Sequence, residues 1–141
     1  MGHDVLIVDD SAVTRQMIKK TLGMAGLDVG DVYEAANGIE ALAVLGDRTV
    51  AVMLLDINMP TMNGIQLLTR MKENARLQHI PVVIASTEGS KERITELERI
   101  GVFGYVRKPF QPEQLRDALV PLLGVKENGT ANNGNADDGV F

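Results

Sequence analysis

The stretch Val5-Leu6-Ile7-Val8-Asp9-Asp10 combines a short apolar run with two adjacent carboxylates. Continuous apolar runs of this length are typical of parallel strands that are buried on both faces of a sheet. Three further runs have the same form: Val52-Met53-Leu54-Leu55, Val82-Val83-Ile84-Ala85 and Tyr105-Val106-Arg107. The residues that directly follow them are Asp56, Ser86 and Lys108. Because ligands of open parallel sheets bind at the carboxyl ends of the strands, we expect three carboxylates, a hydroxyl and an ammonium at one sheet edge.

Amphipathic segments separate the apolar runs and predict helices between the strands. Ser11 is a suitable N-cap for a first helix that reaches about Met24. The remaining elements are expected at 32–35 (strand) and at 38–45, 65–73, 91–100 and from Pro112 to Leu123 (helices), with Pro121 weakening the last turn. Five βα units predict an α/β fold, with a doubly wound five-stranded parallel sheet, right-handed crossovers and helices on both faces.

Composition narrows the class of protein. The chain has 141 residues, of which 45% are hydrophobic and 23% charged, values that are ordinary for a globular domain. A net charge of -5 disfavours nucleic acid or an anionic membrane as the main partner. There is no cysteine, so neither disulfides nor a thiolate metal site are expected. Asp4 interrupts the N-terminal apolar stretch, which argues against a signal peptide or membrane span and predicts a cytoplasmic location.

The composition changes sharply near the C-terminus. After Lys126 the chain is rich in asparagine, glycine and aspartate, and such a segment buries too little apolar surface to offset its ordering entropy. We therefore predict one folded domain over residues 1–124 and a disordered polar tail over 125–141. The simplest interpretation of this tail is a solvated terminus without a function of its own.

The acidic residues at the predicted sheet edge favour a metal site. Crowded carboxylates repel one another, and a hard divalent cation removes that repulsion. Mg²⁺ prefers oxygen ligands, whereas zinc would require histidine or cysteine, so Mg²⁺ is the expected metal. Each residue also has a simpler interpretation. Asp9 or Asp10 could cap the first helix, Asp56 could be a loop residue, Lys108 could be solvated, and Ser86 could bond to local backbone.

Taken together, the ordered motifs resemble the receiver domain of bacterial two-component response regulators, and within that family the single-domain, CheY-like chemotaxis regulators. The resemblance extends over the domain from Asp4 to Leu123. The motifs that carry it are Leu6-Ile7-Val8-Asp9-Asp10-Ser11, the run from Leu55-Asp56 through Asn58-Met59-Pro60 to Gly64, Val82-Val83-Ile84-Ala85-Ser86, and Lys108-Pro109-Phe110. It implies a flavodoxin-like sheet with strand order 2-1-3-4-5.

The resemblance also assigns roles at the sheet edge. It makes Asp56 the residue that is phosphorylated, with Ser86 and Lys108 contacting the phosphoryl oxygens as the other catalytic residues. Asp9, Asp10 and Asp56 would bind Mg²⁺ together with the backbone carbonyl of Asn58. The transfer itself needs mainly positioning and charge neutralisation.

Further roles belong to the residues around that centre. Ser86 and Tyr105 match the pair that changes arrangement on activation, although Tyr105 could also be an ordinary strand aromatic. Asn58 and Glu88 match the positions that tune hydrolysis, and Thr87, where the family usually has a smaller residue, could narrow access to Asp56. The resemblance further predicts a cis peptide bond between Lys108 and Pro109.

The function implied is a stand-alone signalling switch, not an enzyme that turns over a substrate. A histidine kinase would phosphorylate it, and the phosphorylated form would bind a protein target, with the flagellar motor switch as the candidate, and a phosphatase. The protein itself is expected to be a monomer. A phosphorelay intermediate is an alternative. A Mg²⁺-dependent phosphatase of the haloacid dehalogenase type is a more distant one, because those enzymes place two aspartates two residues apart, whereas Asp9 and Asp10 are adjacent.

Overall fold

Strands and helices alternate along the part of the chain that the computed structural model describes, residues 2–59, 61–87 and 89–126. The strands are β1 (His3–Val8), β2 (Val29–Ala35), β3 (Val52–Leu55), β4 (Val82–Ser86) and β5 (Gly104–Arg107). The helices are α1 (Ala12–Met24), α2 (Gly38–Asp47), α3 (Gly64–Lys72), α4 (Lys91–Ile100) and α5 (Pro112–Leu123). None of these helices is long and apolar enough to cross a membrane.

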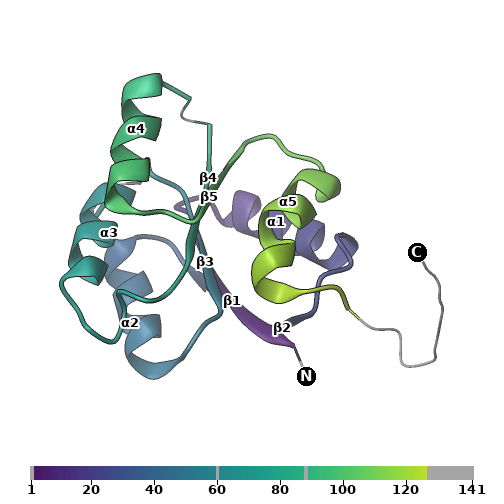
Figure 1. The fold of residues 1–141 in the computed structure, drawn as a ribbon. Helices are drawn as coiled ribbons and strands as arrows, with labels where there is room; N and C mark the ends of the chain where they lie inside the picture. The colour runs from purple at the N-terminus through teal and green to yellow at the C-terminus, as the bar shows by residue number, and fades with distance from the viewer. Residues whose placement is uncertain (1, 60, 88, 127–141) are drawn as a thin grey trace.

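The strands form one parallel sheet with the order β2-β1-β3-β4-β5. The helices cover both faces: α1 and α5 lie on one side, and α2, α3 and α4 lie on the other (Figure 1). This arrangement confirms the predicted fold class and strand order. It also places the carboxyl ends of β1, β3 and β4 side by side, since Val8 pairs with Leu55 and Leu55 pairs with Ile84.

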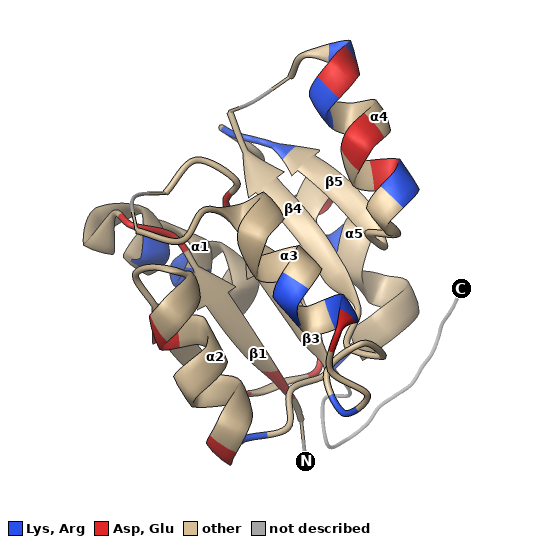
Figure 2. Ribbon diagram, turned by 90° about the vertical axis from the view of Figure 1, so that its left-hand side faces the viewer, with Lys and Arg blue, Asp and Glu red and all other residues tan. Residues whose placement is uncertain are grey.

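Alternation along the central strands divides the apolar core into two layers. Val5 and Ile7 of β1 pack with residues of α1 and α5, while Leu6 and Val8 pack with residues of α2, α3 and α4. β3 and β4 carry no charged side chain along their length, as Figure 2 shows. Polar and charged groups of the centre of the sheet therefore gather where the strands end.

Element boundaries differ from the predicted ones in a few places. β2 begins at Val29 and not at Val32, because β1 also begins early and His3 pairs with Val29. α5, in contrast, has the predicted bounds, and it continues through Pro121 to Leu123, whose side chain is buried. Beyond the predicted domain end at residue 124, Val125 forms a bridge with Leu27 and the Lys126 amide bonds to the Gly26 carbonyl. The rest of the predicted tail, 127–141, lies outside the described residues.

Candidate functional site

The acidic pair follows β1 at the turn into α1. Asp9 is buried, with 2% of its surface exposed, whereas Asp10 is exposed. The cap of α1 is Ser11, whose hydroxyl accepts a hydrogen bond from the Thr14 amide, and the Asp9 carboxylate accepts one from the Ser11 amide at 2.9 Å. Because Ser11 caps the helix, both aspartates remain available at the sheet edge.

Asp56 follows β3, next to the end of β1. It is 8% exposed, and its Oδ1 atom accepts a hydrogen bond from the Asn58 amide at 3.3 Å. The loop that follows is closed by the Gly64 amide, which donates to the Ile57 carbonyl at 2.9 Å. A Cβ atom on Gly64 would lie 2.8 Å from the Ile57 Cα, so only glycine allows this close approach.

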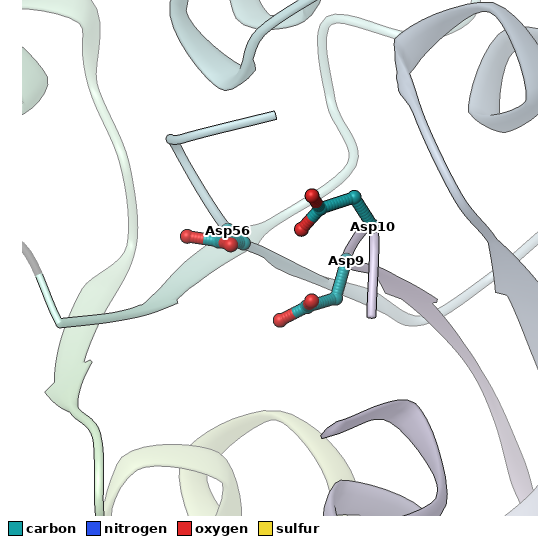
Figure 3. A group of neighbouring side chains, drawn as sticks. All are labelled: Asp9, Asp10 and Asp56. Atoms are coloured by element: carbon teal, nitrogen blue, oxygen red, sulfur yellow. The ribbon is translucent and has the colours of Figure 1, made fainter. Parts of the chain in front are cut away.

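The three carboxylates form one cluster. Asp9, Asp10 and Asp56 each offer an oxygen atom, and these atoms all lie within 4.8 Å of one another. Figure 3 shows the three side chains next to one another at the ends of the two strands. Such an oxygen-only donor set could hold a hard cation.

A buried hydroxyl and an ammonium complete the site. The Ser86 side chain is fully buried at the end of β4 and donates a hydrogen bond to Asp56 Oδ1 at 2.9 Å. Lys108 Nζ lies 2.6 Å from Asp9 Oδ2 and 3.7 Å from Asp56 Oδ2. The peptide bond from Lys108 to Pro109 is cis, as predicted. The structure therefore brings together all five side chains that the sequence placed at this edge.

The surroundings of Asp56 act on its pKa in opposite directions. Burial raises the pKa above the ordinary value of 3.8, and the negative charge of Asp9 adds to this effect. Lys108 lowers it, as do the hydrogen bonds from Ser86 and from the Asn58 amide. The raising effects are larger, so ionised Asp56 is less favoured here than in water.

The other predicted residues lie around this centre. Tyr105 is partly buried on β5, opposite Ile84 of β4, and packs against the apolar layer of α2, α3 and α4. Asn58 and Thr87 are both exposed. Thr87 lines a mainly apolar pocket of about 300 Å³, together with Lys108, Phe110 and residues of α1. Glu88, the other predicted hydrolysis-tuning residue, lies outside the described residues.

The sequence interpretation overlooked one residue, Arg15. Its guanidinium donates to the Asp9 backbone carbonyl at 2.6 Å and to Glu34 Oε1 at 2.9 Å. An arginine one helical turn after a strand-end acidic pair is a signal that could have drawn attention to it. Its partner Glu34, on β2, could be identified only from the tertiary structure.

Comparison with known proteins assigns the class. Residues 5–120 match the model of the response regulator receiver domain, and the chain belongs to this family. Within the family it is 37% identical over 124 residues to the chemotaxis protein CheY1 of Helicobacter pylori, an alignment that covers 87% of this chain and 98% of that protein. It is 38% identical over 121 residues to a CheY homologue of Campylobacter jejuni, covering 85% and 92% of the two chains.

Solved structures give the same result. CheY4 of Vibrio cholerae superimposes with a TM-score of 0.77 at 35% identity, over 86% of this chain and 99% of that one. A putative response regulator of Chloroflexus aurantiacus superimposes with a TM-score of 0.78 at 25% identity, over 86% and 98%. The protein is thus a CheY-like receiver domain, similar along most of its length to chemotaxis response regulators.

Proposed function

We propose that this protein carries a chemotaxis signal by accepting a phosphoryl group on Asp56 from a histidine kinase. The observation that carries the proposal is the environment of the Asp56 carboxylate. It adjoins the acidic pair and contacts a hydroxyl and an ammonium, the groups needed to orient and neutralise an incoming phosphoryl group.

Mg²⁺ is the metal that these residues fit. Asp9, Asp10 and Asp56 supply carboxylate oxygens, and the Asn58 backbone carbonyl is the fourth donor that the family pattern assigns. When bound, the cation would neutralise charge on the phosphoryl oxygens and on the clustered carboxylates.

The chain's own residues account for the rest of the transfer. An Asp56 oxygen forms the new bond to phosphorus while the bond from phosphorus to the histidine nitrogen breaks, and the departing imidazole keeps the electron pair. Ser86 holds Oδ1, which leaves Oδ2, the oxygen nearer Lys108, as the one available for attack. Lys108 then only has to turn from Asp9 toward the new phosphoryl oxygens to stabilise them.

Signal output requires two states that differ in affinity for a partner. Loss of the hydrogen bond from Ser86 to the Asp56 carboxylate, in favour of a phosphoryl oxygen, would change the end of β4. Tyr105 lies on the next strand and is the residue through which this change would reach α4, β5 and α5. To change the ratio of active to inactive conformation from 1:99 to 99:1, roughly 5.5 kcal/mol of differential interaction is needed. A doubly charged phosphoryl group can supply part of this free energy.

The proposed partners are a histidine kinase, a target at the flagellar motor switch and a phosphatase, all in the cytoplasm. The names of the curated relatives, which are chemotaxis proteins, support this reading. We also propose that the protein is a switch and not an enzyme with a separate substrate, so it should not hydrolyse generic phosphate esters.

A binding assay with purified flagellar switch components tests the output. Protein treated with acetyl phosphate and Mg²⁺ should bind at least about 5-fold more tightly than untreated protein, within the usual range of allosteric coupling. Asp56→Asn should show no such gain. Equal affinity of the treated and untreated wild type for the motor components would remove the motor as the target.

A further inference from the structure

Arg15 connects three elements next to the acidic pair. It lies in the first turns of α1, and its side chain is 16% exposed. Nε donates to Glu34 Oε1 on β2 at 2.9 Å, and a terminal nitrogen donates to the Asp9 carbonyl oxygen at 2.6 Å. Since Glu34 pairs with Ile7 of β1 in the sheet, the guanidinium is anchored to a rigid element.

The carbonyl that Arg15 holds belongs to the peptide unit between Asp9 and Asp10. This unit is planar, so fixing its oxygen also fixes the direction in which the chain enters Asp10. The Asp9 side chain has other anchors, namely Lys108 at 2.6 Å and the Ser11 amide at 2.9 Å. Asp10 is exposed, so burial does not fix its carboxylate as it does that of Asp9.

We propose that Arg15 is a positioning residue for the metal site: through the Asp9 carbonyl it holds the Asp10 carboxylate where it can bind Mg²⁺. This inference rests on the proposed metal site. Glu34 takes part by orienting the guanidinium, whose planar fork can donate to a carboxylate and a carbonyl at the same time.

A positioning role and simple charge repulsion predict opposite effects on Mg²⁺ affinity when Arg15 is removed. A guanidinium beside a cation site repels the cation, so removing its charge should strengthen Mg²⁺ binding or leave it unchanged. If Arg15 positions a ligand, its removal should weaken binding in spite of the lost repulsion. Loss of a residue that orients a metal ligand typically reduces metal affinity by about 10–100-fold.

The experiment is a Mg²⁺ titration by calorimetry of the whole chain and three variants. Arg15→Gln should bind Mg²⁺ at least about 10-fold more weakly than the wild type. Arg15→Lys keeps the charge and one donor, so it should retain much of the affinity. Lys19→Gln is the matched control: Lys19 also approaches Glu34, at 3.8 Å, but it has a different position on α1 and makes no bond to the Asp9 carbonyl. It should bind no more weakly than the wild type.

A measurement without metal completes the test. In Mg²⁺-free buffer, amide hydrogen exchange at Asp10 and Ser11 should be faster in Arg15→Gln than in Lys19→Gln, while melting temperatures show that both variants are folded. Unchanged or tighter Mg²⁺ binding by Arg15→Gln, or equal weakening by Lys19→Gln, would overturn the inference. Absence of Mg²⁺ binding by the wild type would instead overturn the proposed metal site, whatever the exchange rates show.

Discussion

The Ser86 hydroxyl donates a hydrogen bond of 2.9 Å to Asp56 Oδ1, so the ends of β3 and β4 are joined through the side chain proposed to be phosphorylated. The bond is buried, and it stabilises the ionised form of Asp56. A phosphoryl group on Asp56 would therefore lie beside the hydroxyl at the end of β4, through which it can act on that strand.

Replacement of Ser86 by alanine tests this connection. Without the hydroxyl, the pKa of Asp56 should rise further, because one of the effects that lower it is gone. Phosphorylation by acetyl phosphate near neutral pH should slow about 10-fold or more, as expected when a group that orients reacting oxygens is lost. An NMR titration of the Asp56 carboxyl and a rate measurement check both parts. Ser86→Thr, which keeps the hydroxyl, is the control and should remain close to the wild type.

The raised pKa of Asp56 predicts how stability depends on pH. Because the folded protein holds this proton more tightly than the unfolded chain, the contribution of Asp56 to stability should fall as the pH rises from the unfolded value of 3.8 through the higher folded value. Asp56→Asn removes the charge and should stabilise the protein at pH 7 by about 1 kcal/mol, or about 3–5 °C in melting temperature. Below pH 3.8 the gain should disappear, since Asp56 is then neutral in both states. Thermal melts across this range that show a constant difference, or a loss of stability at pH 7, would contradict the assignment.

The sequence alone was sufficient to predict the fold and most of the site. Apolar runs that end in polar residues fix the strands, and the carboxyl ends of parallel strands meet at one edge. This is why the sequence predicts that Asp9, Asp56, Ser86 and Lys108 lie together. β2 begins earlier than predicted, at Val29, because this end of the strand pairs with β1. The sequence around Val29 gives only a weak indication of a strand.

Contacts between distant side chains could not be predicted in the same way. The bond from Arg15 to the Asp9 carbonyl depends on where α1 packs and on Glu34 from another strand. Lys108 Nζ lies closer to Asp9 Oδ2 than to Asp56 Oδ2, at 2.6 and 3.7 Å. The spacing of these residues in the sequence does not predict that difference. The roles of Asn58, Thr87 and Glu88 in hydrolysis stay predictions.

Mg²⁺ should stabilise the protein through the acidic cluster. At a concentration of about 100 times the dissociation constant, a ligand that binds only the folded state adds roughly 2.7 kcal/mol. Asp10→Ala should lose this increment, because it removes one of the three carboxylates. Asp117→Ala, which removes an exposed carboxylate from α5, should keep it. A thermal shift with Mg²⁺ that is equal in wild type and Asp10→Ala would exclude Asp10 from the site.

The phosphorylated state should be short-lived. Asn58 and Glu88 match positions that orient a water molecule in line with the phosphorus, which is the geometry that hydrolysis needs. We therefore expect the phosphoryl group to be lost within seconds to minutes, and more slowly when both residues are replaced by bulky apolar ones. Thr87→Ala should leave the rate unchanged or increase it, because Thr87 lies exposed beside Ser86. Radiolabel decay with a half-life of hours in the wild type would argue against a fast taxis signal.

The most direct test of the account is the site of phosphorylation. Wild type and Asp56→Asn should be incubated with acetyl phosphate and Mg²⁺ and compared by intact mass, with borohydride trapping and peptide mapping to locate the modified residue. We predict one phosphoryl group on the wild type, located on Asp56, and none on the variant, while Asp117→Asn behaves like the wild type. Phosphorylation of Asp56→Asn to the wild-type extent, or a label on the wild type at any other residue, would contradict the central claim.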